Sequence, residues 1–194
     1  MAGRVTDEMR RKMTGATPLC DADPIGFIPV GPEHFPLLHQ WLNEPHIQEW
    51  WGDPDEELGF IRDMVEGRDT TRPFLITLDK VPIGYIQYWF IGHHQNEQWI
   101  TDHPWLKELP AETIGVDLSI GHPEKLSQGI GSMALAAFVA TLRKEGYASI
   151  IIDPDSNNAR AVRAYTKAGF RPVPHLDGQT GDVLIMQHDP NATR

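Results

Sequence analysis

The order of the predicted elements indicates an α+β domain with a mixed β-sheet. Strand-like alternation and helical spacing of apolar residues succeed each other along the chain. Two strand-like stretches, Phe74–Leu78 and Ile83–Ile91, flank the turn Asp79-Lys80-Val81-Pro82, which is typical of an antiparallel hairpin. A long apolar helix separates the strands predicted at Ile114–Ile120 and Ile150–Ile152, and a crossover of this kind favours their parallel pairing.

The first half of the chain predicts short strands and helices in alternation. Ile25–Val30 is expected to be a strand that ends at Gly31-Pro32. Apolar residues then recur at helical spacing until Pro45, which ends or bends the helix. A second helix is predicted over Asp55–Glu66. Gly92–Pro110 is predicted to be a long polar and aromatic loop, and loops of this length are often functional or mobile.

In the second half, Ile114–Ile120 alternates in period two, with apolar residues on one side and Asp117 on the other. Ile130–Glu145 is apolar on nearly every face, as expected for a helix buried against a sheet. A further helix is predicted over Asn158–Ala168, closed by Gly169. The chain is expected to end in a hairpin formed by Val173–Leu176 and Val183–Gln187.

Length and composition favour one globular domain. The chain has 194 residues, of which 40% are hydrophobic and 23% charged, values that are ordinary for a packed protein. Residues 1–23 show no sustained periodicity and are predicted to form a flexible N-terminal arm. Residues 24–194 are predicted to form a single domain, because the sequence contains no internal repeat or low-complexity tract.

Charge and cysteine content exclude several classes of protein. The net charge is -10, from 27 acidic and 17 basic residues, which disfavours nucleic acid or an anionic membrane as a partner and suits a cationic substrate. Cys20 is the single cysteine, so an intrachain disulfide and a cysteine-based zinc site are excluded. Met1–Thr17 is polar and no apolar run approaches membrane-spanning length, so we expect a cytoplasmic protein.

Two segments in the second half carry the strongest functional signal. Leu126-Ser127-Gln128-Gly129-Ile130-Gly131 lies between a strand and a helix, where backbone N–H groups and the helix dipole suit a pyrophosphate. A G-x-G pair alone also occurs in structural turns. The second segment, about thirty residues further on, runs from Asn158 through Tyr165 to Gly169-Phe170.

Together these segments resemble the GNAT-type N-acetyltransferases, and within them most closely the aminoglycoside 6'-N-acetyltransferases. The likeness covers roughly residues 27–186. It is carried by four stretches: Trp41-Leu42-Asn43 with His46-Ile47 and Glu49-Trp50-Trp51-Gly52; Pro82–Gln87; Gly115-Val116-Asp117 with Gly129-Ile130-Gly131; and Asp153–Asn158 running into Arg160–Tyr165 and Lys167–Phe170. The resemblance implies a mixed, mostly antiparallel sheet flanked by helices, with a parallel strand pair splayed at the acetyl-CoA site.

The resemblance also implies how acetyl-CoA would be bound, without a metal. The pyrophosphate would lie at Gln128, Gly129, Ile130 and Gly131, next to Leu126, which stands where the superfamily often has Arg or Gln. The pantetheine arm would pair with Leu118, Ser119 and Ile120. Asn158 would contact the coenzyme, although its position also suits a helix N-cap. Tyr165 would contact the coenzyme and protonate the departing thiolate; the alternative is a core aromatic residue.

The acceptor site implied by the resemblance is acidic and aromatic. Asp117 would bind and deprotonate a substrate ammonium group; a carboxylate in an apolar strand could instead form a buried salt bridge. The predicted acceptor-binding residues are Glu49, Trp50, Trp51, Asp53, Gln87, Asp102 and Asp117. His93, His94, Asp102 and His103 fit no common zinc pattern, so no metal is expected.

The expected function is transfer of acetyl from acetyl-CoA to the 6'-amine of an aminoglycoside or similar polycationic amine, by a monomer or homodimer. A siderophore-type lysine or hydroxylamine acyltransferase is an alternative that shares Trp41-Leu42-Asn43, but that branch carries His at the position of Asp117. A protein N-acetyltransferase is a second alternative and would need an open peptide groove. A non-catalytic acyl-CoA sensor is a third, because fold does not determine function.

Overall fold

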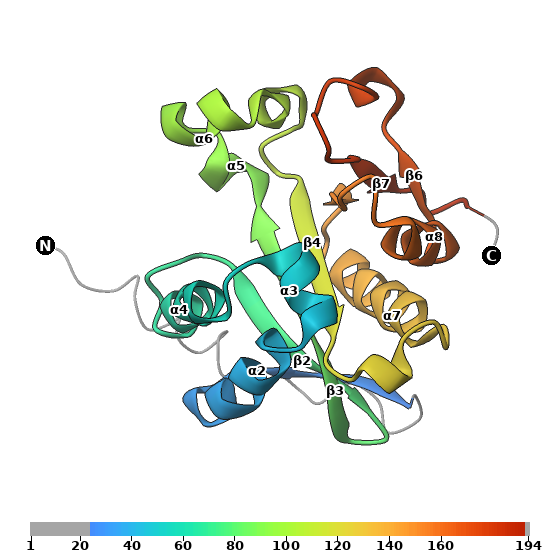
Figure 1. The fold of residues 1–194 in the computed structure, drawn as a ribbon. Helices are drawn as coiled ribbons and strands as arrows, with labels where there is room; N and C mark the ends of the chain where they lie inside the picture. The colour runs from blue at the N-terminus through green and yellow to red at the C-terminus, as the bar shows by residue number, and fades with distance from the viewer. Residues whose placement is uncertain (1–23, 193–194) are drawn as a thin grey trace, which may run out of the picture.

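A seven-stranded mixed sheet forms the centre of the molecule (Figure 1). The structure is a computed structural model and describes residues 24–192, so the predicted arm over residues 1–23 lies outside the described part. The parallel pair is β4 with β5, and every other neighbouring pair is antiparallel, which confirms the predicted fold class. The strands, in their order across the sheet, are β1 (Ile25–Pro29), β2 (Arg72–Leu78), β3 (Val81–Phe90), β4 (Ile114–Ile120), β5 (Ile150–Ile152), β7 (Met186–His188) and β6 (Phe170–Pro172).

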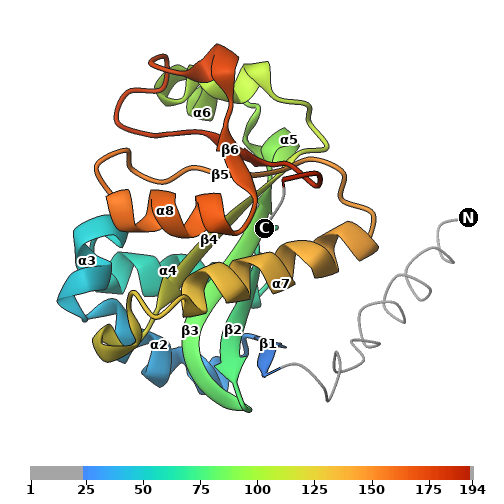
Figure 2. The same cartoon turned by 90° about the vertical axis from the view of Figure 1, so that its right-hand side faces the viewer.

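Helices cover both faces of this sheet (Figures 1 and 2). Because side chains alternate along a strand, neighbouring residues of β2 serve different faces: Leu75 packs with α2, α3 and α4, and Ile76 packs with α7. The α-helices are α2 (Phe35–Leu42), α3 (Pro45–Trp51), α4 (Pro54–Val65), α5 (Ile91–His94), α6 (Glu97–Asp102), α7 (Ile130–Lys144) and α8 (Ala159–Lys167), and the 3-10 turns are η1 (Pro32–His34), η2 (Pro104–Glu108), η3 (Pro123–Lys125) and η4 (Pro174–Leu176).

Strands β4 and β5 pair over a short distance and then diverge. Their register joins Ile114 to Ile150 and Gly115 to Ile151, after which β4 continues without β5 as far as Ile120. Ile114 N donates to Ser149 O on the β5 side (3.1 Å). Because backbone groups alternate in period two, Val116, Leu118 and Ile120 direct theirs toward the same side. The divergence therefore leaves an open strand edge in the middle of the sheet.

Two expectations about local structure were wrong. Gly92–Pro110 is not an irregular loop, since it contains α5, α6 and η2. Two features order this segment: the Asn96 side chain caps α6 by accepting from Trp99 N (3.3 Å), and Trp105, Leu106 and Leu109 are buried beside Ile151. Burial of these apolar side chains outweighs the polar character that the rest of the segment suggests.

The C-terminal hairpin is present, but its strands are not the segments that were predicted. The strand Phe170–Pro172 pairs with Met186–His188, while Pro174–Leu176 forms a 3-10 turn. Proline at position 174 lacks the N–H that a ladder requires and suits the first position of a helical turn. Val183 instead forms an isolated bridge with Asp155. Pro45 ends the predicted helix as expected and also begins α3, a helix that the periodicity did not indicate.

Candidate active site

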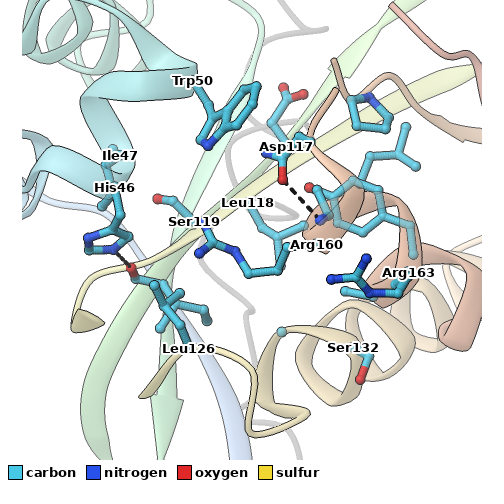
Figure 3. Close-up of a pocket in the computed structure, with 18 of the residues that line it drawn as sticks. His46, Ile47, Trp50, Asp117, Leu118, Ser119, Leu126, Ser132, Arg160 and Arg163 are labelled. Carbon is cyan, nitrogen blue, oxygen red and sulfur yellow. Dashed lines mark hydrogen bonds between the residues drawn. The ribbon is translucent and has the colours of Figure 1, made fainter. Parts of the chain in front are cut away.

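The divergence of β4 and β5 opens into a cavity of about 550 Å³. Its walls come from the second half of β4, the end of β5, the turn before α7, and helices α3, α4 and α8. Figure 3 shows His46 and Trp50 of α3 on one side and Arg160 and Arg163 of α8 on the other. Segments far apart in the sequence therefore share one space of the size that small-molecule sites occupy.

The turn before α7 offers backbone donors to this cavity. Ser127 (φ 61°) and Gly129 (φ 83°) adopt left-handed conformations that swing the chain into the helix. The first backbone hydrogen bond of α7 joins Met133 N to Gly129 O (3.0 Å), so the N–H groups of residues 130–132 have no acceptor within the helix. A Cβ added at Gly131 would meet only Ile120 Cγ1, at 4.0 Å. Exposed donors and the helix dipole make this turn suitable for an anion.

The residues predicted to bind phosphate contribute to the turn in different ways. Leu126, Gly129 and Gly131 line the cavity. The Gln128 side chain turns back into the preceding loop, where Nε2 donates to Glu124 O (2.5 Å). Ile130 is buried in the core. Any role of Gln128 and Ile130 in anion binding would therefore rest on their backbone N–H groups.

Basic side chains gather beside this turn. Lys125 lies just before it, and Arg160, Arg163 and Lys167 project from α8. Within residues 24–192, none of the four forms an ion pair with a carboxylate. Their charges therefore add to the positive potential of the α7 N-terminus.

Carboxylates line the part of the cavity nearer the middle of β4. Asp117 extends from β4, Asp153 follows β5, and Glu57 reaches in from α4. Gln87 on β3 donates through Nε2 to Asp117 Oδ2 (3.0 Å), and Tyr85 Oη donates to Gln87 Oε1 (2.6 Å). The partner of Asp117 is thus an amide, and the described residues offer it no salt bridge.

Burial raises the pKa values of all three acidic groups, and repulsion adds to the rise for Asp153 and Glu57. Burial raises the pKa of Asp117, against the opposing effect of the Gln87 and Trp89 side chains. Burial and the charge of Asp117 raise the pKa of Asp153 well above its ordinary value. The pKa of Glu57 rises from 4.5 to about 7, first through burial and then through the charges of Asp117 and Glu56. A cationic ligand would relieve this repulsion.

Tyr165 and Asn158 lie on α8 and line the cavity. Burial, followed by the charges of Asp117 and Asp153, raises the pKa of Tyr165, so the phenol keeps its proton at neutral pH. Asn158 is the N-cap of α8, and its Oδ1 accepts from Ala161 N (3.1 Å). That cap leaves the side-chain amide donor of Asn158 for a ligand.

The adjacent tryptophans at the end of α3 both line the cavity. Trp51 packs edge-on against Tyr85, with ring centroids 5.7 Å apart. The indole N–H of Trp50 is buried and has no hydrogen-bond partner among residues 24–192. The pair therefore forms an aromatic wall beside the carboxylates.

The other residues predicted to bind the acceptor lie apart from this lining. Glu49 is exposed on α3. Asp53 caps α4 by accepting from Asp55 N (3.0 Å) and Glu56 N (3.1 Å). Asp102 is exposed at the end of α6. Gln87, in contrast, lines the cavity and holds Asp117.

The sequence comparison accounts for this arrangement. Residues 31–178 match the family model described as an acetyltransferase (GNAT) domain. The chain belongs to the GNAT acetyltransferase family. The match spans the open edge of β4, the turn before α7, and all of α8.

Two relatives show how far along the chain the sequence likeness extends. Aminoglycoside N(6')-acetyltransferase type 1 of Klebsiella pneumoniae is 30% identical over 158 residues, which are 77% of this chain and 75% of that protein. A kanamycin resistance protein of Rhizobium radiobacter is 34% identical over 83 residues, 42% of this chain and 77% of that protein. The likeness to the Klebsiella enzyme therefore extends over most of both chains.

Solved structures show the same fold. AAC(6')-Ib in complex with paromomycin and acetyl-CoA has a TM-score of 0.72 and 26% identity, covering 88% of this chain and 96% of that one. AAC(6')-Ib in complex with coenzyme A and kanamycin has a TM-score of 0.70 and 26% identity, covering 87% and 96%. Each superposition includes nearly the whole of the neighbour.

Three residues of this GNAT site were missed as functional candidates in the sequence: His46, Glu57 and Asp153. His46 lies on α3, and its Nε2 donates to Ile120 O at the open edge of β4 (2.8 Å; Figure 3). Glu57 is one of several acidic residues in the first turn of α4, so nothing in the sequence marks it out. Asp153 directly follows β5, and the position of a polar residue at a strand end was the signal available.

Two further findings concern residues 24–192. No group of three or more His, Cys, Asp or Glu side chains within them is arranged to hold a metal ion. Every helix in this part of the chain is too short or too polar to cross a lipid bilayer.

Proposed function

We propose that this GNAT acetyltransferase transfers acetyl from acetyl-CoA to the 6'-amine of an aminoglycoside or a similar polycationic amine. The observation that carries the proposal is the separation of charge within one cavity. Basic residues and helix N–H groups line the cavity at α7 and α8, Glu57 and Asp117 line it from α4 and β4, and Asp153 follows β5. A phosphorylated donor and a cationic acceptor can therefore bind together with their reacting groups between the two ends.

The basic end fits the phosphates of coenzyme A. Free N–H groups at residues 130–132 suit the pyrophosphate, and the absence of a side chain at Gly131 permits close approach of the backbone. The open edge of β4 suits the amide groups of pantetheine, because Leu118 directs its backbone groups into the gap. When bound, acetyl-CoA supplies the activated acyl group.

The acidic end fits the acceptor amine and its proton. The amine nitrogen must lose a proton before it forms a bond to the acyl carbon, and Asp117 is placed to accept that proton directly or through water. Breaking of the carbon–sulfur bond leaves a thiolate, and Tyr165, whose phenol is protonated at neutral pH, can donate its proton to that thiolate. The aromatic wall of Trp50 and Trp51 is suited to cover a sugar ring.

A thiol-release assay on purified protein tests this proposal. Kanamycin-like compounds with a 6'-amine should be acetylated faster than analogues with a 6'-hydroxyl. The aminoglycoside relatives and their complexes support this choice of acceptor. Absence of turnover on every 6'-amino aminoglycoside, together with rapid turnover on a lysine derivative or peptide, would contradict the substrate and leave the acetyltransferase chemistry.

A further inference from the structure

Glu57 is a carboxylate of the catalytic cavity to which the chemistry above assigns no role. It reaches the cavity from α4, on the opposite sheet face from α7, and meets the space beside Asp117, Trp50 and Trp51. Its neighbour Glu56 is exposed on the same helix turn and is not part of the cavity lining. Within the described residues, the Glu57 side chain makes no hydrogen bond or ion pair. A half-buried carboxylate without a partner is costly unless a ligand supplies one.

Among residues 24–192, no basic side chain forms an ion pair with Glu57. The charges acting on it are Asp117 across the cavity and Glu56 beside it, both negative. On the surrounding elements, Tyr85 of β3 donates to Gln87, His46 of α3 donates to Ile120 O, and His39 of α2 is bonded to Asp55 (3.0 Å). All the Lys and Arg residues of the cavity belong to the α7 and α8 end.

We propose that Glu57 binds a second ammonium group of the acceptor, so that the enzyme selects amines carrying another positive charge besides the reacting one. This inference rests on the proposed function and adds the residue that would distinguish a polycation from a monoamine. Asp117 would bind the reacting nitrogen. Glu57 lines the same cavity from α4, near the aromatic wall, where a second amino group of the same acceptor can reach it. Two separated carboxylates would thus each bind one ammonium group of the acceptor, and this charge complementarity would favour a polycation over a monoamine.

Binding of a second ammonium group would change the protonation of Glu57. In the free enzyme Glu57 is about half protonated near pH 7, because its pKa is about 7. An ammonium group beside it favours the charged carboxylate and lowers the pKa, so binding of the acceptor releases the proton. A neutral residue at position 57 cannot release one.

The test compares two acceptors on three proteins. The acceptors are kanamycin, which has several amines, and 6-amino-6-deoxyglucose, which has one; the proteins are the wild type, Glu57→Gln and the matched control Glu56→Gln. Loss of one charge-assisted contact should lower kcat/KM for kanamycin by ~10- to 100-fold in Glu57→Gln. The value for the monoamine should change little, and Glu56→Gln should resemble the wild type with both acceptors.

Calorimetry gives an independent readout. Kanamycin binding to the coenzyme A complex, measured near pH 7 in buffers of different ionisation enthalpy, should release more protons from the wild type than from Glu57→Gln. If Glu57→Gln does not fold, Glu57→Asp replaces it, and the selectivity should change in the same direction by a smaller factor.

The outcomes separate the two proposals. An equal loss on both acceptors, or no loss on either, would overturn the role of Glu57 while leaving the proposed function in place, and so would equal proton release from wild type and variant. If the wild type acetylates the monoamine but not kanamycin, the proposed function fails and the role of Glu57 fails with it.

Discussion

Burial, together with the charges of two cavity carboxylates, Asp117 and Asp153, raises the pKa of Tyr165, so its phenol is protonated at neutral pH. A protonated phenol facing the divergence of β4 and β5 can serve as an acid but not as a base at neutral pH. Replacement by phenylalanine keeps the ring and removes the proton. We expect Tyr165→Phe to lower kcat by ~10- to 10³-fold with little change in acetyl-CoA affinity. Steady-state kinetics and calorimetry check this, and unaltered turnover with a rate-limiting chemical step would return Tyr165 to a packing role.

His46 acts on the backbone of the open strand. Its donation to Ile120 O ties α3 to the end of β4, and this bond fixes the edge along which pantetheine is proposed to lie. We expect His46→Ala to raise the KM for acetyl-CoA by ~2- to 10-fold, the range of one hydrogen bond, with a smaller change in the KM for the acceptor. His46→Gln keeps a donor and should restore part of the affinity. Equal increases in both KM values, without rescue by Gln, would refute a specific effect on the donor edge.

At the scale of elements, the proposed donor site lies at the junction of β4 and α7. Gly131 has open space in front of it, so Gly131→Val should fold but should project methyl groups where phosphate must approach. The expected result is a loss of acetyl-CoA binding by isothermal titration calorimetry. Ala140→Val, at an exposed position of the same helix, is the matched control and should bind normally. Tight binding by a folded Gly131→Val would exclude this turn as the phosphate site.

The elements differ in how far the sequence predicted them. Period-two alternation located β4 at Ile114–Ile120, and continuous apolar spacing located α7, because burial of these elements dominates their composition. The C-terminal hairpin was misplaced because Val173 and Val183 were predicted to be strand residues. Both valines instead pack against the segment that contains Trp105 and Leu106. Such contacts join residues about seventy positions apart and leave no local pattern.

Residues of the candidate site also differ in how far the sequence predicted them. Asp117, Tyr165 and the glycine turn were predicted as site residues because their motifs are local and resemble a known family. Glu57 and His46 reach the cavity only because α3 and α4 fold onto the sheet face opposite α7. Only the tertiary packing of these helices makes the two residues candidates for a functional role. Asp53, which has the same chemistry and lies a few residues from Glu57, is used instead to cap α4.

At the scale of the whole molecule, three acidic groups with raised pKa values should make stability depend on pH. Glu57 has a folded pKa of about 7 against an ordinary value of 4.5, so the folded state binds more protons than the unfolded state between these values. Its stabilising contribution is complete below about pH 4.5 and is lost as the pH rises through about 7. The Tm of the wild type, measured calorimetrically, should therefore fall more between about pH 5 and about pH 8 than that of Glu57→Gln. Parallel curves for the two proteins would contradict the raised pKa.

The location of the transferred acetyl group tests the central claim most directly. Kanamycin incubated with the enzyme and acetyl-CoA should yield one monoacetylated product, and NMR should place the acetyl group on the 6'-nitrogen. Asp117→Asn, which keeps the shape of the side chain, should lose most of this product while still binding acetyl-CoA. A product acetylated at a different nitrogen, or undiminished 6'-acetylation by Asp117→Asn, would contradict the assignment of the acidic end of the cavity as the place where the 6'-amine reacts.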